Sequence, residues 1–223
     1  EEAAAFAEAI GARPCHELQH LEAHRGLYLL AVKDDAIAAV ARDLHRAGKI
    51  LPETLIAHTS GATPSSVLAP YAVRYGVFYP LQSMNRNRAV EMSEIPLCIT
   101  ASDEKGKAAL LALAQRISSR AQIISDEQRA ALHLAAVFVN NFTNAVLQGA
   151  HDIAEEEGAP FELLLPLLQE TIRKAADSTP KAVQTGPAIR GDEATLSRHR
   201  AQLANHPQLL TVYDALSNYI KTF

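Results

Sequence analysis

In the first half of the chain, short apolar runs alternate with segments in which apolar residues recur at helical spacing. A short apolar run is typical of a strand buried on both faces, and a helical segment between two such runs is typical of a crossover connection. The predicted strands, the second with its turn, cover 26–32, 54–61, 76–82, 96–102 and 121–125, and the predicted helices cover 2–10, 34–47, 64–75 and 103–119. This alternation predicts a mostly parallel sheet with helices on both faces.

The pattern changes at Ser125, after which nothing strand-like remains. Ser125 and Gln128 form a capping box, which marks the start of a long helix. We expect this helix to run unbroken to Glu157 and to end at Gly158. The later helices are predicted from Pro160 to Ala176, with a kink at Pro166, and at 193–204 and 207–221. The chain therefore divides into an α/β domain, residues 1–125, and an all-helical domain, residues 126–223.

Composition narrows the classes of function. The chain has 223 residues, of which 48% are apolar, enough for a sizeable core. Its net charge of −4 argues against nucleic acid as the main partner. We find no leader and no apolar run near the roughly 18 residues that a membrane span needs. Together with only two cysteines, these features predict a cytoplasmic protein that acts on a small molecule.

One side of the long predicted helix is apolar and another side is polar. The polar side carries His133, Asn140, Asn144, Gln148 and His151, with Asn141 beside them. Such a side is either a solvated face or a face that lines a cleft. Asparagine is a mediocre helix former, and three asparagines within five residues favour the cleft.

The segment HELQH, residues 16–20, matches the H-E-x-x-H pattern of zinc proteases. On a helix, His16, His20 and His24 would share one face and could bind zinc, with Glu17 as a general base. The segment is short, however, and lies between a predicted helix and a predicted strand. We therefore expect no metal site here and keep a zinc hydrolase as an alternative.

Five short motifs then occur in a fixed order along nearly the whole chain. They are AVKDDAI (31–37), HTSGA (58–62), YPLQSM (79–84), HLAAVFVNNFTNAV (133–146) and TGPAIRGDEATLSRH (185–199). Together they resemble a family of Rossmann-like NADP oxidoreductases that is often labelled deazaflavin-dependent NADP-oxidoreductase-like. The resemblance implies a Rossmann-like sheet followed by a helical dimerisation domain, similar in architecture to 6-phosphogluconate dehydrogenase and pyrroline-carboxylate reductase. It implies NADP as the cofactor, and deazaflavin only through the family label.

These residues depart from the family at its phosphate-binding turn. Their ten glycines never adopt the G-x-G-x-x-G spacing that holds a pyrophosphate on backbone N–H groups. We therefore expect the first βαβ unit to be missing from this sequence. A chain that carries such a turn is expected to bind NADP(H) more tightly than these residues alone.

The resemblance also implies a site at the ends of the predicted strands, where open α/β sheets bind ligands. The implied cofactor-binding residues are Ala31, Val32, Lys33, His58, Thr59, Ser60 and Gly61. The implied substrate-binding residues are Pro80, Gln82, Ser83, Asn141, Thr185, Gly186 and Arg190. The catalytic residue stays open among His58, His199 and Asn141.

The tripeptide Arg190-Gly191-Asp192 does not need an adhesion receptor to explain it. Arg190 offers a planar fork of donors that suits a carboxylate or phosphate, and Asp192 is placed to cap the next helix. The alternative is a loop in which Arg190 simply pairs with Asp192.

The favoured function is an NADP-linked oxidoreductase that transfers a hydride to or from an unknown small substrate at the cleft between the domains. A relative that binds ligand without catalysis is the main alternative, ahead of the zinc hydrolase. A homodimer is also expected, because leucines surround the helix near residue 165 on nearly every side.

Overall fold

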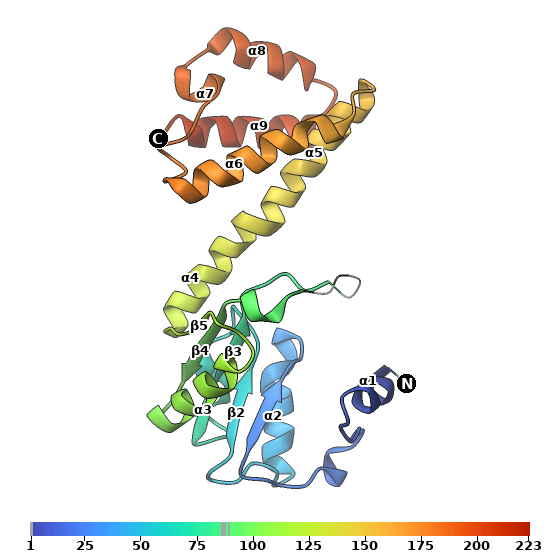
Figure 1. Cartoon of the computed structure of the whole chain (residues 1–223), viewed down its shortest axis with the longest axis vertical. Coiled ribbons are helices and arrows are strands. Elements are labelled where there is room, and N and C mark those ends of the chain that lie inside the picture. Colours follow the sequence, from blue (N-terminus) through green and yellow to red (C-terminus); the bar gives the residue numbers. More distant parts are fainter. Residues whose placement is uncertain (1, 86–87, 89) are drawn as a thin grey trace. The chain divides into compact units, whose positions relative to one another are not determined.

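A five-stranded sheet whose strand order follows the sequence forms the first part of the protein, with helices on its two faces (Figure 1). The computed structural model describes residues 2–85, 88 and 90–223. Strands β1 (Leu27–Leu30), β2 (Leu55–His58) and β3 (Arg74–Pro80) are parallel. Strand β4 (Leu97–Ala101) runs antiparallel to β3, and β5 (Ala121–Ile123) runs parallel to β4. The predicted class, a Rossmann-like and mostly parallel sheet followed by helices, is confirmed.

The two faces of the sheet carry separate cores, which explains the unbroken apolar runs of its strands. Ile56 of β2 packs in one cluster with Ile37 and Leu44 of helix α2 (Ile37–Arg46). The neighbouring Leu55 and Ala57 point to the opposite face. Their cluster also contains Leu110 and Ala114 of helix α3 (Glu104–Gln115). Every residue of β2 is therefore buried.

A long helical segment follows the sheet and begins at the predicted cap. The Ser125 side chain accepts from Gln128 N, and the Gln128 side chain accepts from Ser125 N, so the capping box is confirmed. The segment consists of α4 (Asp126–Ala136), a π-helical turn η5 (Val137–Phe142) and α5 (Thr143–Glu156). The prediction of an unbroken helix to Glu157 is correct in extent but missed the π turn.

This long segment corrects the prediction that no apolar run reaches membrane length. Asp126–Glu156 has 31 residues, and an 18-residue window within it has a mean hydropathy of 1.3 with none of its residues buried. By length and composition alone the helix could cross a membrane. The core helix of a soluble protein and a signal sequence pass the same test, so a single such helix does not show a membrane span.

The chain forms two compact units, Glu1–Phe142 and Thr143–Phe223. The second unit is all helical. After α5 it contains α6 (Leu165–Asp177), the short α7 (Pro187–Arg190), α8 (Glu193–Gln202) and α9 (Pro207–Ile220). The domain boundary predicted after residue 125 stays a prediction.

Several predicted elements need correction. The helix predicted at 64–75 is only a 3₁₀ turn, η3 (Ser65–Leu68), and strand β3 already begins at Arg74. Residues Phe161–Leu164 form another 3₁₀ turn before α6. Pro166 does not kink a helix, because α6 begins just before it and a proline fits the first turn. The predicted loop before residue 193 contains α7, which starts after Gly186 and ends at Gly191, both at positive φ. Helix α1 (Glu2–Ala9) ends near Gly11, as predicted.

Candidate functional site

The carboxyl ends of β1, β2 and β3 meet at one edge of the sheet, because parallel strands that are neighbours end together. Leu30 of β1 pairs with His58 of β2, and His58 pairs with Val77 of β3. The residues predicted to bind a cofactor follow β1 and β2 directly. Ser60 Oγ lies 2.8 Å from Asp34 Oδ2, which joins the loop after β2 to the loop after β1. The structure therefore brings these two predicted segments together.

The exposure of these segments differs. Ala31, Val32 and Lys33 are exposed, with Val32 39% exposed, whereas Ser60 and Gly61 are buried. The Ser60 hydroxyl accepts from the backbone N–H groups of Ala62 and Thr63, which holds the turn. The strip after β1 is thus free to contact a ligand, and the turn after β2 supports it.

His58 is fully buried, and both of its ring nitrogens have partners in the same turn. Nδ1 accepts from Ser60 N at 3.2 Å, so the proton lies on Nε2, which is 3.4 Å from the carbonyl oxygen of Pro64. Burial lowers the pKa of His58, because it disfavours the charged ring, and the hydrogen bond to Pro64 opposes this only in part. These contacts favour a neutral, structural His58 over the predicted catalytic one.

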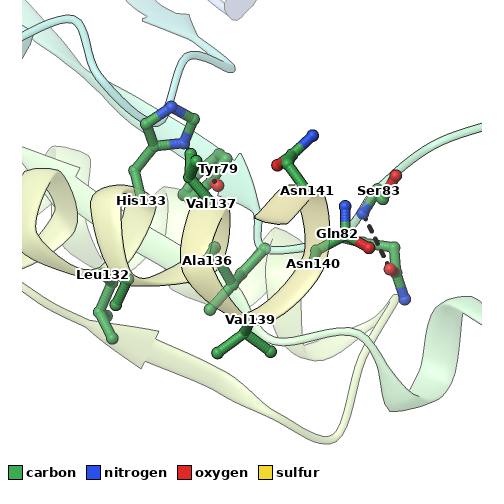
Figure 2. Close-up of a pocket in the computed structure, with 12 residues that line it drawn as sticks. Tyr79, Gln82, Ser83, Leu132, His133, Ala136, Val137, Val139, Asn140 and Asn141 are labelled. Atoms are coloured by element: carbon green, nitrogen blue, oxygen red, sulfur yellow. Dashed lines mark hydrogen bonds between the residues drawn. The ribbon is translucent and has the colours of Figure 1, made fainter. Parts of the chain in front are cut away.

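A pocket of about 550 Å³ lies beside the carboxyl end of β3, within the first unit. Its walls come from the end of β3, the loop that follows and the last turns of α4 with η5 (Figure 2). The polar lining consists of Tyr79, Gln82, Ser83, His133, Asn140 and Asn141. Three of these, Gln82, Ser83 and Asn141, are predicted substrate residues, so the structure gathers them at one pocket. Pro80, another predicted substrate residue, is the last residue of β3 and lies beside them.

The π turn lies in the part of the long helix that lines this pocket. It contains both Asn140 and Asn141, and single π turns inside α-helices often occur at functional sites. His133, Val137 and Asn141 follow one another at intervals of four, and His133 and Asn141 project from the same side of the helix (Figure 2). Val139 points from the opposite side and is 76% exposed.

Tyr79 of β3 and His133 of α4 form a polar pair in the pocket wall. The Tyr79 hydroxyl lies 3.2 Å from His133 Nδ1, and the two rings meet edge to face with centroids 6.0 Å apart. Burial raises the pKa of Tyr79, with a further contribution from Cys98, and the charge of Arg129 opposes it. Tyr79 is therefore a neutral phenol at physiological pH.

Gly61, from the turn after β2, packs directly against this pair. A Cβ at Gly61 would lie 2.5 Å from His133 Nδ1 and 2.7 Å from Tyr79 Cζ. No real side chain tolerates such distances, so only glycine leaves room for the pair at this position. The predicted role of Gly61 was cofactor binding, and the structure adds this steric reason for a glycine.

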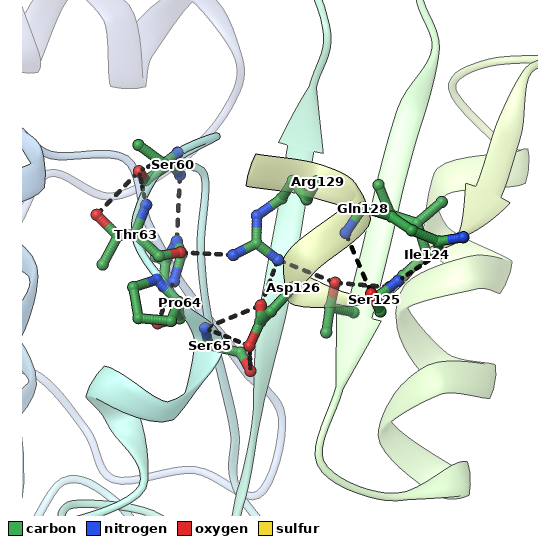
Figure 3. A network of polar contacts seen from close by, with 12 residues as sticks. Ser60, Thr63, Pro64, Ser65, Ile124, Ser125, Asp126, Gln128 and Arg129 are labelled. Carbon is green, nitrogen blue, oxygen red and sulfur yellow. Dashed lines mark hydrogen bonds and ion pairs between the residues drawn. The ribbon is translucent and has the colours of Figure 1, made fainter. Parts of the chain in front are cut away.

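A buried arginine, Arg129, fixes α4 on the sheet (Figure 3). Arg129 Nη1 donates to Asp126 Oδ1 and Thr100 Oγ1, and Nη2 donates to the carbonyl oxygen of Thr63. Asp126 in turn accepts from the backbone N–H and the hydroxyl of Ser65. The Arg129 side chain is 1% exposed. The network therefore joins α4 to β4 and to the loop after β2.

Burial raises the pKa of Asp126, but hydrogen bonds from Ser65 and Arg129 outweigh it and leave the pKa below its usual value. Asp126 is therefore an ionised partner of Arg129 at neutral pH. The Nε atom of Arg129 is buried and has no hydrogen-bond partner within the described residues.

The remaining predicted substrate residues lie in the second unit. Thr185 is exposed and Gly186 precedes α7, while Arg190 is the last residue of α7 and is exposed. The Asp192 side chain accepts from Thr195 N, so its predicted role as the cap of α8 is confirmed. His199 Nδ1 lies 2.9 Å from the Tyr213 hydroxyl. The functional roles of Thr185, Gly186, Arg190 and His199 stay predictions.

The HELQH segment does not form the helix that zinc binding needs. Residues 13–17 are irregular, and only Leu18–His20 form a short 3₁₀ turn. His16, His20 and His24 therefore do not share a helical face, which corrects that part of the zinc alternative. Within the described residues, three histidine or carboxylate side chains lie close together elsewhere, on α5: His151 and Asp152, which are half-buried, and Glu155, which is exposed.

Sequence reasoning missed Tyr79, His133 as a site residue, and Arg129. Tyr79 and His133 are 54 positions apart, and Arg129 and Thr63 are 66 apart. No local spacing reveals such contacts. A weak signal existed, because Tyr79 opens YPLQSM and His133 opens HLAAVFVNNFTNAV, two of the motifs that carry the resemblance.

Comparison with known proteins agrees with this architecture. A Rossmann-like domain matches residues 6–82. The Domain of unknown function (DUF2520) matches residues 95–220, which is more than half of the chain. The chain belongs to this family. No curated protein matches it.

One solved structure is similar to the whole chain. A "putative NADP oxidoreductase" from Bacteroides fragilis is 37% identical, with a TM-score of 0.87, and the match covers 100% of this chain and 86% of that chain. The resemblance to Rossmann-like NADP oxidoreductases is thereby confirmed for this DUF2520 protein.

Two more distant structures show the fold alone. A protein from Thermotoga maritima is 22% identical with a TM-score of 0.72, covering 98% of this chain and 84% of that chain. An imine reductase from Myxococcus stipitatus, in complex with NADP+, is 13% identical with a TM-score of 0.67, covering 98% of this chain and 81% of that chain.

Proposed function

We propose that this DUF2520 protein is an NAD(P)-linked oxidoreductase that transfers a hydride to or from a carbonyl or imine carbon of a small substrate. The observation that carries the proposal is the polar pocket beside the carboxyl end of β3, next to the ends of two parallel strands. In open α/β sheets this edge is where dinucleotides bind. The relative from Bacteroides fragilis, with its NADP oxidoreductase name and 37% identity, supports the same class.

The residues after β1 and β2 suit the ribose and nicotinamide side of the cofactor. Ala31, Val32 and Lys33 form an exposed strip in which small or slender side chains leave room for a flat ligand. The turn at Ser60 and Gly61 is held rigidly beside it. A bound NADP(H) supplies or accepts the hydride. The protein contributes the surface that orients it, and the sequence offers no glycine-rich turn for the pyrophosphate.

The pocket suits an uncharged reacting group. Its lining offers the amides of Gln82, Asn140 and Asn141 and the hydroxyl of Ser83, with apolar walls that include Leu81 and Val137. Among the described residues, none that lines it is Asp, Glu, Lys or Arg. Amide groups can orient a carbonyl or imine through hydrogen bonds, and the apolar walls bind the rest of the molecule. The predicted contribution of Arg190 remains part of the proposal for substrates that carry an anion.

Calorimetry with NADPH, NADP+, NADH and NAD+ tests the cofactor site. Val32→Asp places a negative charge on the exposed strip, where it should repel the cofactor phosphates and weaken binding at least about tenfold, or about 1.4 kcal/mol. Val73→Asp is the matched control, because Val73 is 81% exposed and precedes β3, at the opposite edge of the sheet.

If none of the four dinucleotides bound to the protein, the proposal would be contradicted. It would also be contradicted if Val32→Asp and Val73→Asp bound the dinucleotide with equal affinity. A turnover screen with aldehydes, ketones and cyclic imines then separates the enzyme from its main alternative. Cofactor binding without any turnover would favour the relative that binds ligand without catalysis. The cytoplasmic location stays a prediction, and so does deazaflavin as a second cofactor, which rests on the family label alone.

A further inference from the structure

The proposed reaction needs a group that exchanges a proton with the substrate heteroatom, and the pocket holds one arrangement suited to it. We propose that His133 exchanges this proton through Nε2 and that Tyr79 is the positioning residue that holds the imidazole. The inference rests on the proposed hydride transfer. Three independent features of the pair support it: its place in the pocket wall, the short distance between Tyr79 Oη and His133 Nδ1, and the fit of Gly61.

The first feature is position. His133 lines the pocket together with Asn140 and Asn141, and it is half-buried, so it can reach both a ligand and solvent. Nδ1 is the nitrogen beside the Tyr79 hydroxyl, and in Figure 2 the other ring nitrogen points away from Tyr79. Nε2 is therefore the nitrogen available for exchange.

The second feature is the short distance between the Tyr79 oxygen and His133 Nδ1. Tyr79 stays a neutral phenol, whose oxygen can accept a hydrogen bond. When the imidazole is protonated, Nδ1–H must donate, and the phenol oxygen 3.2 Å away accepts. In the proposed neutral state, the remaining proton stays on Nδ1 and the phenol oxygen continues to accept; the opposite tautomer, in which Tyr79 donates to Nδ1, is the outcome that the NMR test below distinguishes. Nε2 then carries the free lone pair that the reverse reaction requires.

The third feature is the packing around the pair. The backbone at Gly61 approaches so closely that a Cβ would collide with both His133 and Tyr79. Arg129, one helical turn before His133, anchors the helix through Asp126 and Thr63. The imidazole is therefore held between a strand, a turn and a fixed helix. Preorganisation of this kind is what proton transfer in a site requires.

The step balances in both directions. In reduction, the substrate carbon receives the hydride of NADPH, and the π electrons of the C=O or C=N bond move to the heteroatom. The heteroatom takes the Nε2 proton of the His133 imidazolium, which becomes a neutral imidazole with its proton on Nδ1. NADPH becomes NADP+, and solvent returns the proton to Nε2. Oxidation reverses each transfer.

The first test needs neither cofactor nor substrate. Nitrogen-15 NMR of the imidazole at a pH where it is neutral should show the proton of His133 on Nδ1, and Tyr79→Phe should shift the population toward the Nε2–H form. Tyr75→Phe, on the same strand but outside the pocket, is the matched control and should leave the spectrum unchanged. A proton on Nε2 in the unmodified protein would overturn the inference.

The second test uses the cyclic imine or aldehyde that gives the fastest turnover with NADPH in the screen described above. His133→Gln should lower kcat by about 100-fold or more, the usual contribution of general acid–base catalysis, with KM changed only a few-fold. Tyr79→Phe should lower kcat by a smaller factor. His45→Gln, outside the pocket, is the control, and NADPH affinity should remain within twofold in every variant.

The outcomes separate this inference from the proposed function. A His133→Gln variant that binds NADPH and keeps its kcat would refute the inference and leave the oxidoreductase intact. Failure of the unmodified protein to bind NADPH or to turn over any probe would refute the proposed function and the inference with it. Gly61→Ala gives a further check, because it should displace the ring and reproduce the loss of kcat without removing either side chain.

Discussion

At the scale of single residues, the turn after β2 shows how a polar sequence becomes a rigid support. His58 and Ser60 are buried and use their side chains to hold the backbone of the same turn. A buried neutral histidine makes stability depend on pH. The pKa of His58 is lowered by burial, whereas in the unfolded chain it returns to about 6.5.

The lowered pKa of His58 makes the folded protein less stable as the pH falls. Above about pH 6.5, His58 is neutral in both states and has no effect on the pH dependence. As the pH falls below this value, the unfolded chain binds a proton that the folded chain does not, and the free energy of unfolding decreases. We predict that His58→Gln shows a smaller loss of stability between pH 7 and pH 5 in urea titrations. His16→Gln, in the exposed irregular segment, should keep the original slope. Equal slopes for both variants would contradict the prediction.

Residues at the ends of strands could be predicted from the sequence, because an apolar run fixes where a parallel strand ends and which side chains follow it. Val32, Gln82 and Ser83 lie where this reasoning placed them. The pairing of Tyr79 with His133 could not be predicted, because it depends on how a helix 54 positions later crosses the sheet. Residues at the site were therefore predictable as strand ends, and their polar partners were not.

At the scale of elements, a capping box and a buried arginine fix the start of α4. The local signal, Ser125 with Gln128, was visible in the sequence and predicted the first residue of the helix. The arginine one turn later was not, since a lone Arg in a helix is usually exposed. The π turn also escaped prediction, because it changes the hydrogen-bond pattern without changing the apolar spacing.

The arginine gives a prediction for the stability of the first unit. Arg129→Met removes the buried positive charge that pairs with Asp126 and the donor that bonds to the carbonyl oxygen of Thr63. It should lower the free energy of unfolding by about 3 kcal/mol, because Asp126 is left without its partner. Asp126→Asn added to Arg129→Met should recover part of this loss, because it removes the carboxylate left without its partner.

Arg42→Met is the matched control, because Arg42 forms an exposed ion pair with Asp43. Its effect should stay below about 1 kcal/mol. Urea titration of the three variants measures these differences. A loss in Arg129→Met no larger than in Arg42→Met would show that the buried network does not hold the helix.

At the scale of the whole molecule, the change of pattern at Ser125 predicted that helices alone follow the sheet, whereas the two compact units divide at Phe142 and Thr143. What the sequence could not give is what covers the apolar surface that remains. In the second unit, Leu163, Leu167 and Ile172 are 73%, 64% and 62% exposed. A soluble monomer rarely leaves side chains of this size uncovered in one region, and a helix apolar on nearly every side is normally buried.

We therefore predict a homodimer in which a second copy covers the helix α6. Burial of apolar surface contributes about 25 cal/mol per Å², and a stable interface needs more than about 1,000 Å², which several exposed leucines on adjoining helices can supply.

Leu167→Glu places a charge in this surface and should convert the dimer to a monomer at micromolar concentration in light scattering. Val73→Glu, equally disruptive in chemistry but on the first unit, should remain a dimer. A monomeric unmodified protein would contradict the prediction, and if it also sedimented with lipid vesicles, the long apolar helix Asp126–Glu156 would instead belong to a membrane surface.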